Sequence, residues 1–320
     1  MVINILFSRR ISLKTLDNTK NVNISASAVA LGNFDGLHIG HIKLIDEILY
    51  HSKRENIPSV VWSFRQHPEN MIRGDITVKR ITTLDEKAEL LSSKGVDYLV
   101  LEDFNAVRDL SPDDFIKNIL IDGLHARLVV VGFNFRFGKN AAGTSEYLSS
   151  ELKKYGVTVK IIPPVIYGDT LVSSSVIRAL IENGSMEQAA LLLGRPFFIS
   201  FPVIHGRAFG RTIGIPTINQ LFPDDHIVPE RGVYATACHI DGLPYLGVCN
   251  VGVRPTVSNA ETVTCETHII DFVGSLYGQN IRVEFYKKLR SETKFSSVDK
   301  LQDQIKRDIE ETKSYYNLHF

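Results

Sequence analysis

Residues 27–41 have the sequence SAVALGNFDGLHIGH, and they decide the fold of the first half of the chain. The first five are a short apolar run of the kind that forms buried β-strands, and Gly32 begins a glycine-rich turn. Apolar residues then recur at helical spacing, at positions 42, 45 and 49. A strand, a tight turn and a helix in immediate succession predict the opening of a βαβ unit.

Short apolar runs alternate with helix-period segments up to about residue 193. The expected strands are residues 27–31, 59–64, 97–101, 128–131 and 157–162. Two intervening helices have recognisable starts, because Thr83 with Glu86 forms a capping box and Ser111 precedes Pro112 in the first helical turn. The alternation predicts a doubly wound parallel sheet that binds ligands beyond the carboxyl ends of its strands.

The sequence pattern changes after residue 196, where short runs of alternating apolar and polar residues are broken by glycine and proline. The expected strands here are residues 232–240, 245–251, 262–271 and 281–289. These runs favour a compact antiparallel barrel, closed by an amphipathic helix over residues 298–312. We therefore expect an α/β domain over residues 1–184 and a barrel domain over residues 185–320.

Composition excludes several classes of function. The chain has 320 residues, of which 44% are hydrophobic, and 36 basic residues balance 36 acidic ones, so nothing draws it to nucleic acid. Its three cysteines are an odd number without a CxxC pair, which argues against a disulfide framework and a zinc cage. The start, residues 1–10, places Arg9 and Arg10 after its apolar run, unlike a secretory signal. We expect a cytoplasmic protein without membrane contact; self-association is left open.

The glycine turn is suited to phosphate chemistry. Glycines allow close backbone approach to an anion, and a helix N-terminus offers N–H donors and a positive dipole end. His38 and His41 can reach one phosphoryl group there and stabilise charge during in-line displacement. A pair of capping and core histidines is the alternative, and a metal site lacks a third ligand at a sensible spacing. The expected phosphate-binding residues of the turn are Gly32, Asn33, Phe34, Asp35, Gly36 and Gly40.

Two further segments are predicted at the same rim. Residues 131–138, VGFNFRFG, follow a strand and suit a polar ligand, although aromatic core packing is the alternative. Residues 172–178, VSSSVIR, open a helix where Ser173, Ser174 and Arg178 could clamp a triphosphate. A plain serine cap is the alternative for the second segment.

A second site is predicted within residues 205–219, HGRAFGRTIGIPTIN. Gly206, Gly210 and Gly214 give a backbone able to wrap a phosphate, while Thr217 and Asn219 supply the oxygen ligands that Mg²⁺ prefers. In the strand after residue 262, an inward-facing Glu266 could accept a hydroxyl proton as general base. The alternatives are a surface hairpin loop and a solvated strand face.

The motifs GNFDGLHIGH, FRQHP, RITTLDEKAELL, GFNFRFG and SSSVIR occur in the order typical of the prokaryotic FAD synthetase family, which the chain resembles over about residues 25–312. The barrel segment resembles the riboflavin kinase domain, through residues 210–219, GVY at 232–234, RPT at 254–256 and Glu266 with His268. Four positions depart from the usual pattern: Gln66, Ser175, Phe201 and Ile218.

The resemblance implies two activities that use MgATP. The first domain would be a nucleotidyltransferase that converts FMN and ATP to FAD, with His38 and His41 on the ATP phosphates. The second would be a six-stranded antiparallel barrel that phosphorylates riboflavin to FMN. We carry the family roles over to Asn33, Asn134, Ser173, Ser174 and Arg178, and expect flavin contacts from Asn134, Phe135 and His268.

Two alternatives remain open from the sequence. In a one-activity paralogue or a flavin-binding regulator, one site would still bind its ligand but would have lost its catalytic rate. The spacing of His38 and His41 also occurs in class I aminoacyl-tRNA synthetases, but the chain is short for that class, lacks a KMSKS-like loop and has no basic surplus for tRNA.

Overall fold

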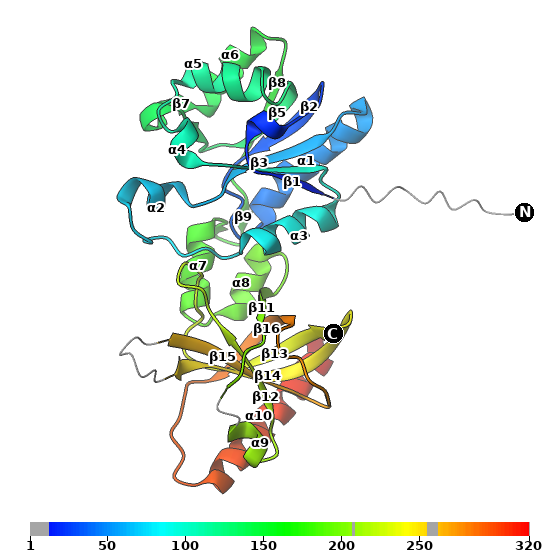
Figure 1. Ribbon diagram of the computed structural model, residues 1–320, viewed down its shortest axis with the longest axis vertical. Helices are drawn as coiled ribbons and strands as arrows, with labels where there is room; N and C mark the ends of the chain where they lie inside the picture. Colours follow the sequence, from blue (N-terminus) through cyan, green and yellow to red (C-terminus); the bar gives the residue numbers. More distant parts are fainter. Residues whose placement is uncertain (1–12, 207–208, 255–261, 320) are drawn as a thin grey trace, which may run out of the picture. The chain divides into compact units, whose positions relative to one another are not determined.

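The computed structural model describes residues 13–206, 209–254 and 262–319, and it divides into two compact units, Met1–Val172 and Ser173–Phe320 (Figure 1). The predicted features at residues 1–10 and in the RPT turn at 254–256 fall wholly or partly outside the described residues. Each unit has its own sheet. Among the described helices, none is at once long enough and apolar enough to cross a membrane.

The first unit is built on a six-stranded parallel sheet in the order β1-β4-β3-β2-β5-β8. Its strands are β1 (Lys14–Leu16), β2 (Ser27–Leu31), β3 (Ser59–Phe64), β4 (Tyr98–Glu102), β5 (Ala126–Gly132) and β8 (Thr158–Ile162). Its helices are α1 (Ile39–Glu55), α2 (Pro68–Arg73), α3 (Leu84–Lys94), α4 (Phe104–Val107), α5 (Pro112–Phe115) and α6 (Ser145–Lys153). Short elements complete it: η1 (Thr19–Asn21), η2 (Ile116–Ile121), β6 (Arg136–Phe137), η3 (Lys139–Ala141), β7 (Gly143–Thr144), β9 (Ile166–Tyr167) and β10 (Thr170–Leu171).

Helices cover both faces of this sheet, as a doubly wound fold requires (Figure 1). On one face Ala28, Ala30 and Val130 pack with apolar residues of α1 and α3. On the other, Val29 and Val131 pack with residues of α5, η2 and α6. Successive residues of a strand point to opposite faces, so an unbroken apolar strand is the pattern for a sheet buried on both sides.

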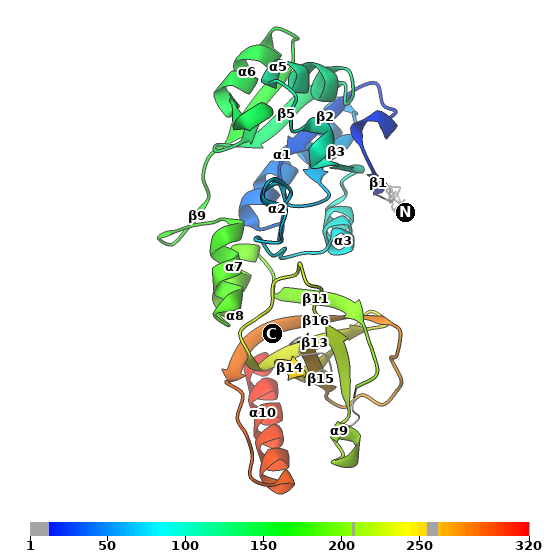
Figure 2. The same cartoon turned by 60° about the vertical axis from the view of Figure 1, so that its left-hand side comes forward.

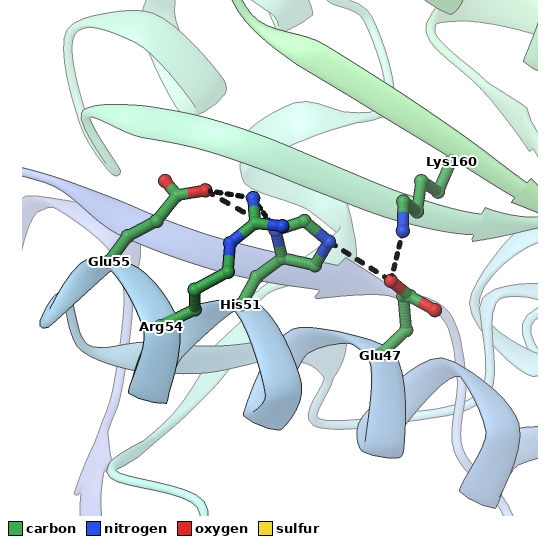
Figure 3. Close-up of polar contacts among 5 residues, drawn as sticks. All are labelled: Glu47, His51, Arg54, Glu55 and Lys160. Carbon is green, nitrogen blue, oxygen red and sulfur yellow. Dashed lines mark hydrogen bonds and ion pairs between the residues drawn. The ribbon is translucent and has the colours of Figure 1, made fainter.

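Helix α1 is fixed to the edge strand β8 by a charged cluster (Figure 3). Lys160 of β8 pairs with Glu47, whose Oε1 lies 3.1 Å from His51 Nε2. One helical turn later, His51 Nδ1 lies 3.3 Å from Glu55 Oε1, and Arg54 donates to the same oxygen at 2.9 Å. The cluster fixes the C-terminal half of α1, so its N-terminus is presented at a defined place above the sheet edge.

The second unit is a six-stranded antiparallel sheet in the order β11-β16-β13-β14-β15-β12. The strands are β11 (Phe197–Pro202), β12 (Thr217–Leu221), β13 (Gly232–Ile240), β14 (Leu243–Arg254), β15 (Thr262–Ile269) and β16 (Asn280–Arg290). The helices are α7 (Ser174–Glu182), α8 (Met186–Leu193), α9 (Phe209–Thr212) and α10 (Val298–His319). A bridge between Ile204 and Asn219 brings the chain after β11 to β12, so the two ends of the sheet curl toward each other into a partly closed barrel.

Helix α10 covers one face of the barrel, alongside β13 and β14 (Figure 2). Val233 and Val248 pack with Ile309 of the helix. Arg290 donates three hydrogen bonds to the carboxylate of the buried Asp308, at 2.8–3.2 Å. The helix runs seven residues beyond the expected end at 312. The cause is tertiary, since Tyr316 meets Tyr286 edge to face, with ring centroids 6.2 Å apart.

The predicted fold class is confirmed, with differences at particular elements. The capping box at Thr83 and the cap at Ser111 are present. Strands β1, β11 and β12 were not predicted as strands. Strand β1 has only three residues, and β12 lies in the segment interpreted as a glycine loop, where Pro216 and Gly214 hide the strand pattern.

Candidate active sites

The first candidate site lies where the strand order of the parallel sheet reverses. From β2 the chain proceeds outward through β3 to β4, and then returns to place β5 on the other side of β2. In open α/β sheets, ligands bind at such a switch point, beyond the carboxyl ends of the two strands. The turn 32–41 follows β2 and the segment 133–137 follows β5. The topology thus brings the histidine turn and the Asn134 loop to one edge of the sheet.

The turn after β2 has a strained backbone. Phe34, Gly36 and Leu37 have φ angles of 47°, 77° and 39°, in the left-handed region. For residues other than glycine this conformation costs roughly 1–3 kcal/mol each, and it persists only where the surroundings enforce it. Phe34 and Leu37 are fully buried, so packing against the core provides part of that enforcement. A strained turn held by its core is a common property of ligand sites.

The side chain of Asp35 is buried and points into the protein interior. Its carboxylate accepts hydrogen bonds from the backbone N–H groups of Ile81 at 2.9 Å and Thr82 at 3.2 Å, and Thr82 Oγ1 accepts from the Gly36 N–H at 3.2 Å. These contacts tie the turn to the segment before α3 and so support its backbone. The expected part of Asp35 in phosphate binding stays a prediction.

The two histidines form a stacked pair at the start of α1. His38 caps the helix, and its Nδ1 accepts a hydrogen bond from the His41 backbone N–H at 3.2 Å. The rings are 3.6 Å apart between centroids and 15° from parallel. Because Nδ1 of His38 accepts, its ring proton is assigned to Nε2. Gly40 allows this stack, since a Cβ there would lie 3.1 Å from the His38 ring.

Burial lowers the pKa of His41 well below its usual value, and the nearby His38 and Lys87 lower it further. His41 is therefore neutral at neutral pH in the free protein. Within the described part of the chain, its buried Nδ1 has no hydrogen-bond partner. A buried polar atom without a partner costs free energy, which is recovered when a ligand supplies one. An incoming phosphate oxygen is the kind of partner that this position suits.

Lys87 and Ser63 are residues of this site that the sequence analysis missed. Lys87 is only 5% exposed, and its Nζ donates to the Asn33 carbonyl at 2.8 Å and to Ser63 Oγ at 3.3 Å. Burial lowers the pKa of Lys87 to about 8, against the opposing effect of Asp35. A signal existed in the sequence, because Lys87 falls on the same helical face as Leu84 and Leu91.

The remaining predicted residues of the first site lie in two segments, the loop after β5 and the start of α7. Asn134 is exposed after β5, while Phe135 is partly buried and stacks on Phe137 at 5.8 Å, which supports core packing for at least part of its ring. Ser173 caps α7, in line with the expected helix start. Ser174 and Arg178 also belong to α7, in the second compact unit, and their roles stay predictions.

The second candidate site lies across three strands of the barrel. Asn219 of β12, Glu266 of β15 and Asn250 of β14 are in direct register, and Thr217 is opposite His268 two residues further on. Residues in register share a face, and so do residues two apart on a strand. The register therefore brings Thr217, Asn219, Glu266 and His268 together. Thr217 and Asn219 have neutral side-chain oxygens, and Glu266 has a carboxylate.

Glu266 does not face the closed interior that we expected. Cys265 and Thr267 on either side of it are fully buried, whereas Glu266 and His268 are half-buried on the opposite face. Burying a carboxylate among apolar side chains is costly, and the alternation of the strand places Glu266 on the more exposed face of β15. His268 Nδ1 lies 2.8 Å from the Pro216 carbonyl, which fixes its ring beside Thr217.

The predicted glycines of this segment differ in their surroundings. A Cβ on Gly206 would lie 2.6 Å from the Asn219 amide, and one on Gly210 would lie 2.2 Å from the Ile215 carbonyl. Gly214 has a φ of 72° and open space around it. Gly206 thus packs directly on a predicted metal ligand, while Gly210 closes a turn through the Ile215 N–H at 2.7 Å.

Comparison with known proteins shows the family of both halves of the chain. The FAD synthetase family model matches residues 20–176 and the riboflavin kinase model matches residues 193–316. The bifunctional riboflavin kinase/FMN adenylyltransferase of Bacillus subtilis is 38% identical over 91% of this chain and 93% of its own length. The enzyme of the same description from Escherichia coli is 33% identical over 96% and 98%.

The chain belongs to this bifunctional family. It is a riboflavin kinase and FMN adenylyltransferase, a transferase that produces FMN and FAD. A solved structure from Streptococcus pneumoniae, described as a macrolide-efflux protein, matches with a TM-score of 0.84 and 32% identity, over 95% of this chain and 99% of that one. The boundary between the domains at 184 and 185 stays a prediction.

Substitution of Gly206 by alanine is expected to impair the kinase step of this enzyme. The added methyl group would meet the Asn219 amide, so either the side chain or the backbone must shift, and such overpacking costs about 1–3 kcal/mol. We expect FMN formation from riboflavin to fall about tenfold, in line with that energy. Rates with riboflavin and with FMN as starting flavin check this. Equal losses in both rates would contradict a local effect.

Proposed function

We propose that the strained turn after β2 carries adenylyl transfer to FMN, and that the Asn219–Glu266 row of the barrel carries riboflavin phosphorylation. The main support for the proposal is that each of the two predicted catalytic motifs lies at a place suited to its chemistry. One is the switch point of a parallel sheet, and the other is a register row of oxygen and carboxylate side chains.

In the first reaction, a phosphate oxygen of FMN attacks the α-phosphorus of ATP and diphosphate leaves. No enzyme nucleophile is needed, so the task of the protein is positioning and charge stabilisation. The N-terminus of α1 supplies N–H donors and a positive dipole end, and His38 and His41 supply ring donors. Ser173, Ser174 and Arg178 of α7 are proposed to bind phosphate as well.

In the second reaction, the 5′-hydroxyl of riboflavin attacks the γ-phosphorus of ATP and ADP leaves. Glu266 takes the hydroxyl proton, because it is a half-buried carboxylate on the accessible face. Asn250, its register partner, donates to Glu292 Oε1 at 3.3 Å and so lies in a polar row beside it. The glycines at 206, 210 and 214 are proposed to shape the phosphate-binding backbone.

Mg²⁺ fits the residues of the kinase row. The hydroxyl of Thr217 and the amide oxygen of Asn219 are hard but neutral ligands, and they share a face with Glu266. When bound, the ion would neutralise phosphate charge on ATP. A pair of neutral protein oxygens suits an ion that arrives with phosphate ligands of its own, since Mg²⁺ commonly keeps only one or two protein ligands in such sites.

ATP, riboflavin and FMN are thus the proposed small-molecule partners, and a cytoplasmic location follows from that requirement for ATP. The test incubates the pure protein with MgATP and either riboflavin or FMN, and resolves the flavins by chromatography over time. FAD from both starting flavins would support the proposal. FAD from FMN alone, or FMN from riboflavin without FAD, would identify a one-activity paralogue.

A further inference from the structure

One peptide group of the glycine turn is held from beneath by side chains. The carbonyl of Asn33 accepts two hydrogen bonds, from Lys87 Nζ at 2.8 Å and from Ser63 Oγ at 3.0 Å. Lys87 Nζ also lies 3.3 Å from Ser63 Oγ, so the three groups form a closed triangle. Ser63 is fully buried at the end of β3 and Lys87 is nearly so in the first turn of α3.

The other end of that peptide group points the opposite way. A trans peptide is planar, and its N–H lies antiparallel to its carbonyl. Because Lys87 and Ser63 hold the Asn33 carbonyl on their side, the Phe34 N–H is directed to the other side. Within the described residues, the Phe34 N–H has no acceptor. The triangle therefore fixes the direction of an unpaired backbone donor in the middle of the phosphate-binding turn.

The electrostatic surroundings of Lys87 connect it with His41. The charged groups that act on Lys87 are Asp35, which favours its ammonium form, and Arg80, which opposes it. Burial is the main cause of the lowered pKa of His41, and His38 and then Lys87 lower it further. A single buried ammonium thus supports the turn backbone and also acts electrostatically on the adjacent ring.

We infer that Lys87 is a positioning residue for adenylyl transfer, which aims the Phe34 N–H at an ATP phosphate oxygen by holding the Asn33 carbonyl. This inference rests on the function proposed for the turn. In this proposal Lys87 acts on the phosphate only through the backbone of the turn, which would otherwise have to be oriented anew in each catalytic cycle.

The test replaces Lys87 by methionine, which preserves most of the side-chain length without a charge. We expect kcat/KM for FAD formation from FMN to fall about 10- to 100-fold, the usual effect of losing a group that orients a ligand-contacting one. FMN formation from riboflavin should stay within about twofold. The matched control is Lys94→Met, at the exposed end of the same helix, which should leave both rates unchanged.

Two further measurements separate positioning from a purely structural role. In Lys87→Met, NMR titration of the His41 ring should show a higher pKa, because a neighbouring positive charge has been removed. Ser63→Ala removes a smaller part of the same triangle, and should lower FAD formation about threefold to tenfold even if Lys87→Met fails to fold.

The outcomes are distinct. Folded Lys87→Met with a wild-type rate of FAD formation would overturn the inference, as would a Ser63→Ala variant with unchanged rates where Lys87→Met does not fold. A wild-type protein that makes no FAD at all would contradict the proposed function instead. The wild-type assay with FMN and MgATP is therefore run first.

Discussion

Replacement of His41 by alanine is expected to lower FAD formation from FMN about 10²- to 10³-fold, while FMN formation from riboflavin stays within about twofold. His41 stacks on His38 at the N-terminus of α1, at the switch point of the parallel sheet. Its loss would remove a donor that is proposed to stabilise charge on the α-phosphate during adenylyl transfer. The kinase row lies in the other compact unit, so it should not respond. Rates with riboflavin and with FMN measure both effects.

His51→Ala provides the matched control for this substitution. His51 is a buried histidine of the same helix, ten positions further on, and its contacts are with Glu47, Glu55 and Arg54 (Figure 3). The substitution is expected to lower the stability of the protein somewhat and to leave the rate of FAD formation close to wild type. If His51→Ala impaired catalysis as strongly as His41→Ala, the loss would belong to the helix and not to the site.

Replacement of Glu266 by glutamine is expected to have the reverse effect. FMN formation should fall about 10²- to 10⁴-fold, because the riboflavin hydroxyl would lose its proton acceptor, while FAD formation from FMN continues. Glutamine keeps the size of the side chain and its hydrogen-bonding ability in the row with Asn219 and Asn250. The same two-substrate assay measures the result, with protein concentration and folding matched to the wild type.

The control for the second prediction is Glu284→Gln. Glu284 belongs to β16 of the same sheet, where its carboxylate is bonded to His239 and Tyr286. Both kinase and adenylyltransferase rates should stay near wild type in this variant. A Glu266→Gln protein that phosphorylates riboflavin at an unchanged rate would show that another group, or solvent, takes the proton.

Much of the first site could be predicted because its residues are contiguous in sequence. The strand, the glycine turn and the capped helix are local features, so turn chemistry and helical spacing predict them without reference to the rest of the chain. The oxygen-bearing side chains of Thr217 and Asn219 were recognisable for the same reason, although Asn219 is buried. Their roles in catalysis stay predictions.

Other parts of the site depend on contacts between distant segments. Nothing near Asp35 in the sequence indicates that its carboxylate accepts from residues 81 and 82, some 46 positions away. Lys87 and Ser63 meet the Asn33 carbonyl from two other elements. The orientation of Glu266 likewise follows from the alternation of β15 against its neighbours, and its local pattern left both faces open.

The sequence by itself determined the two architectures, the position of the glycine turn between strand and helix, and the identity of the groups available for chemistry. These depend on local backbone preferences and on hydrophobic periodicity, which act within a few residues. Only the tertiary structure decided that β5 returns beside β2, that Lys87 supports the turn, and that Asn219, Glu266 and Asn250 form one row. Strand order and register are set by burial over the whole sheet, and no local segment contains that information.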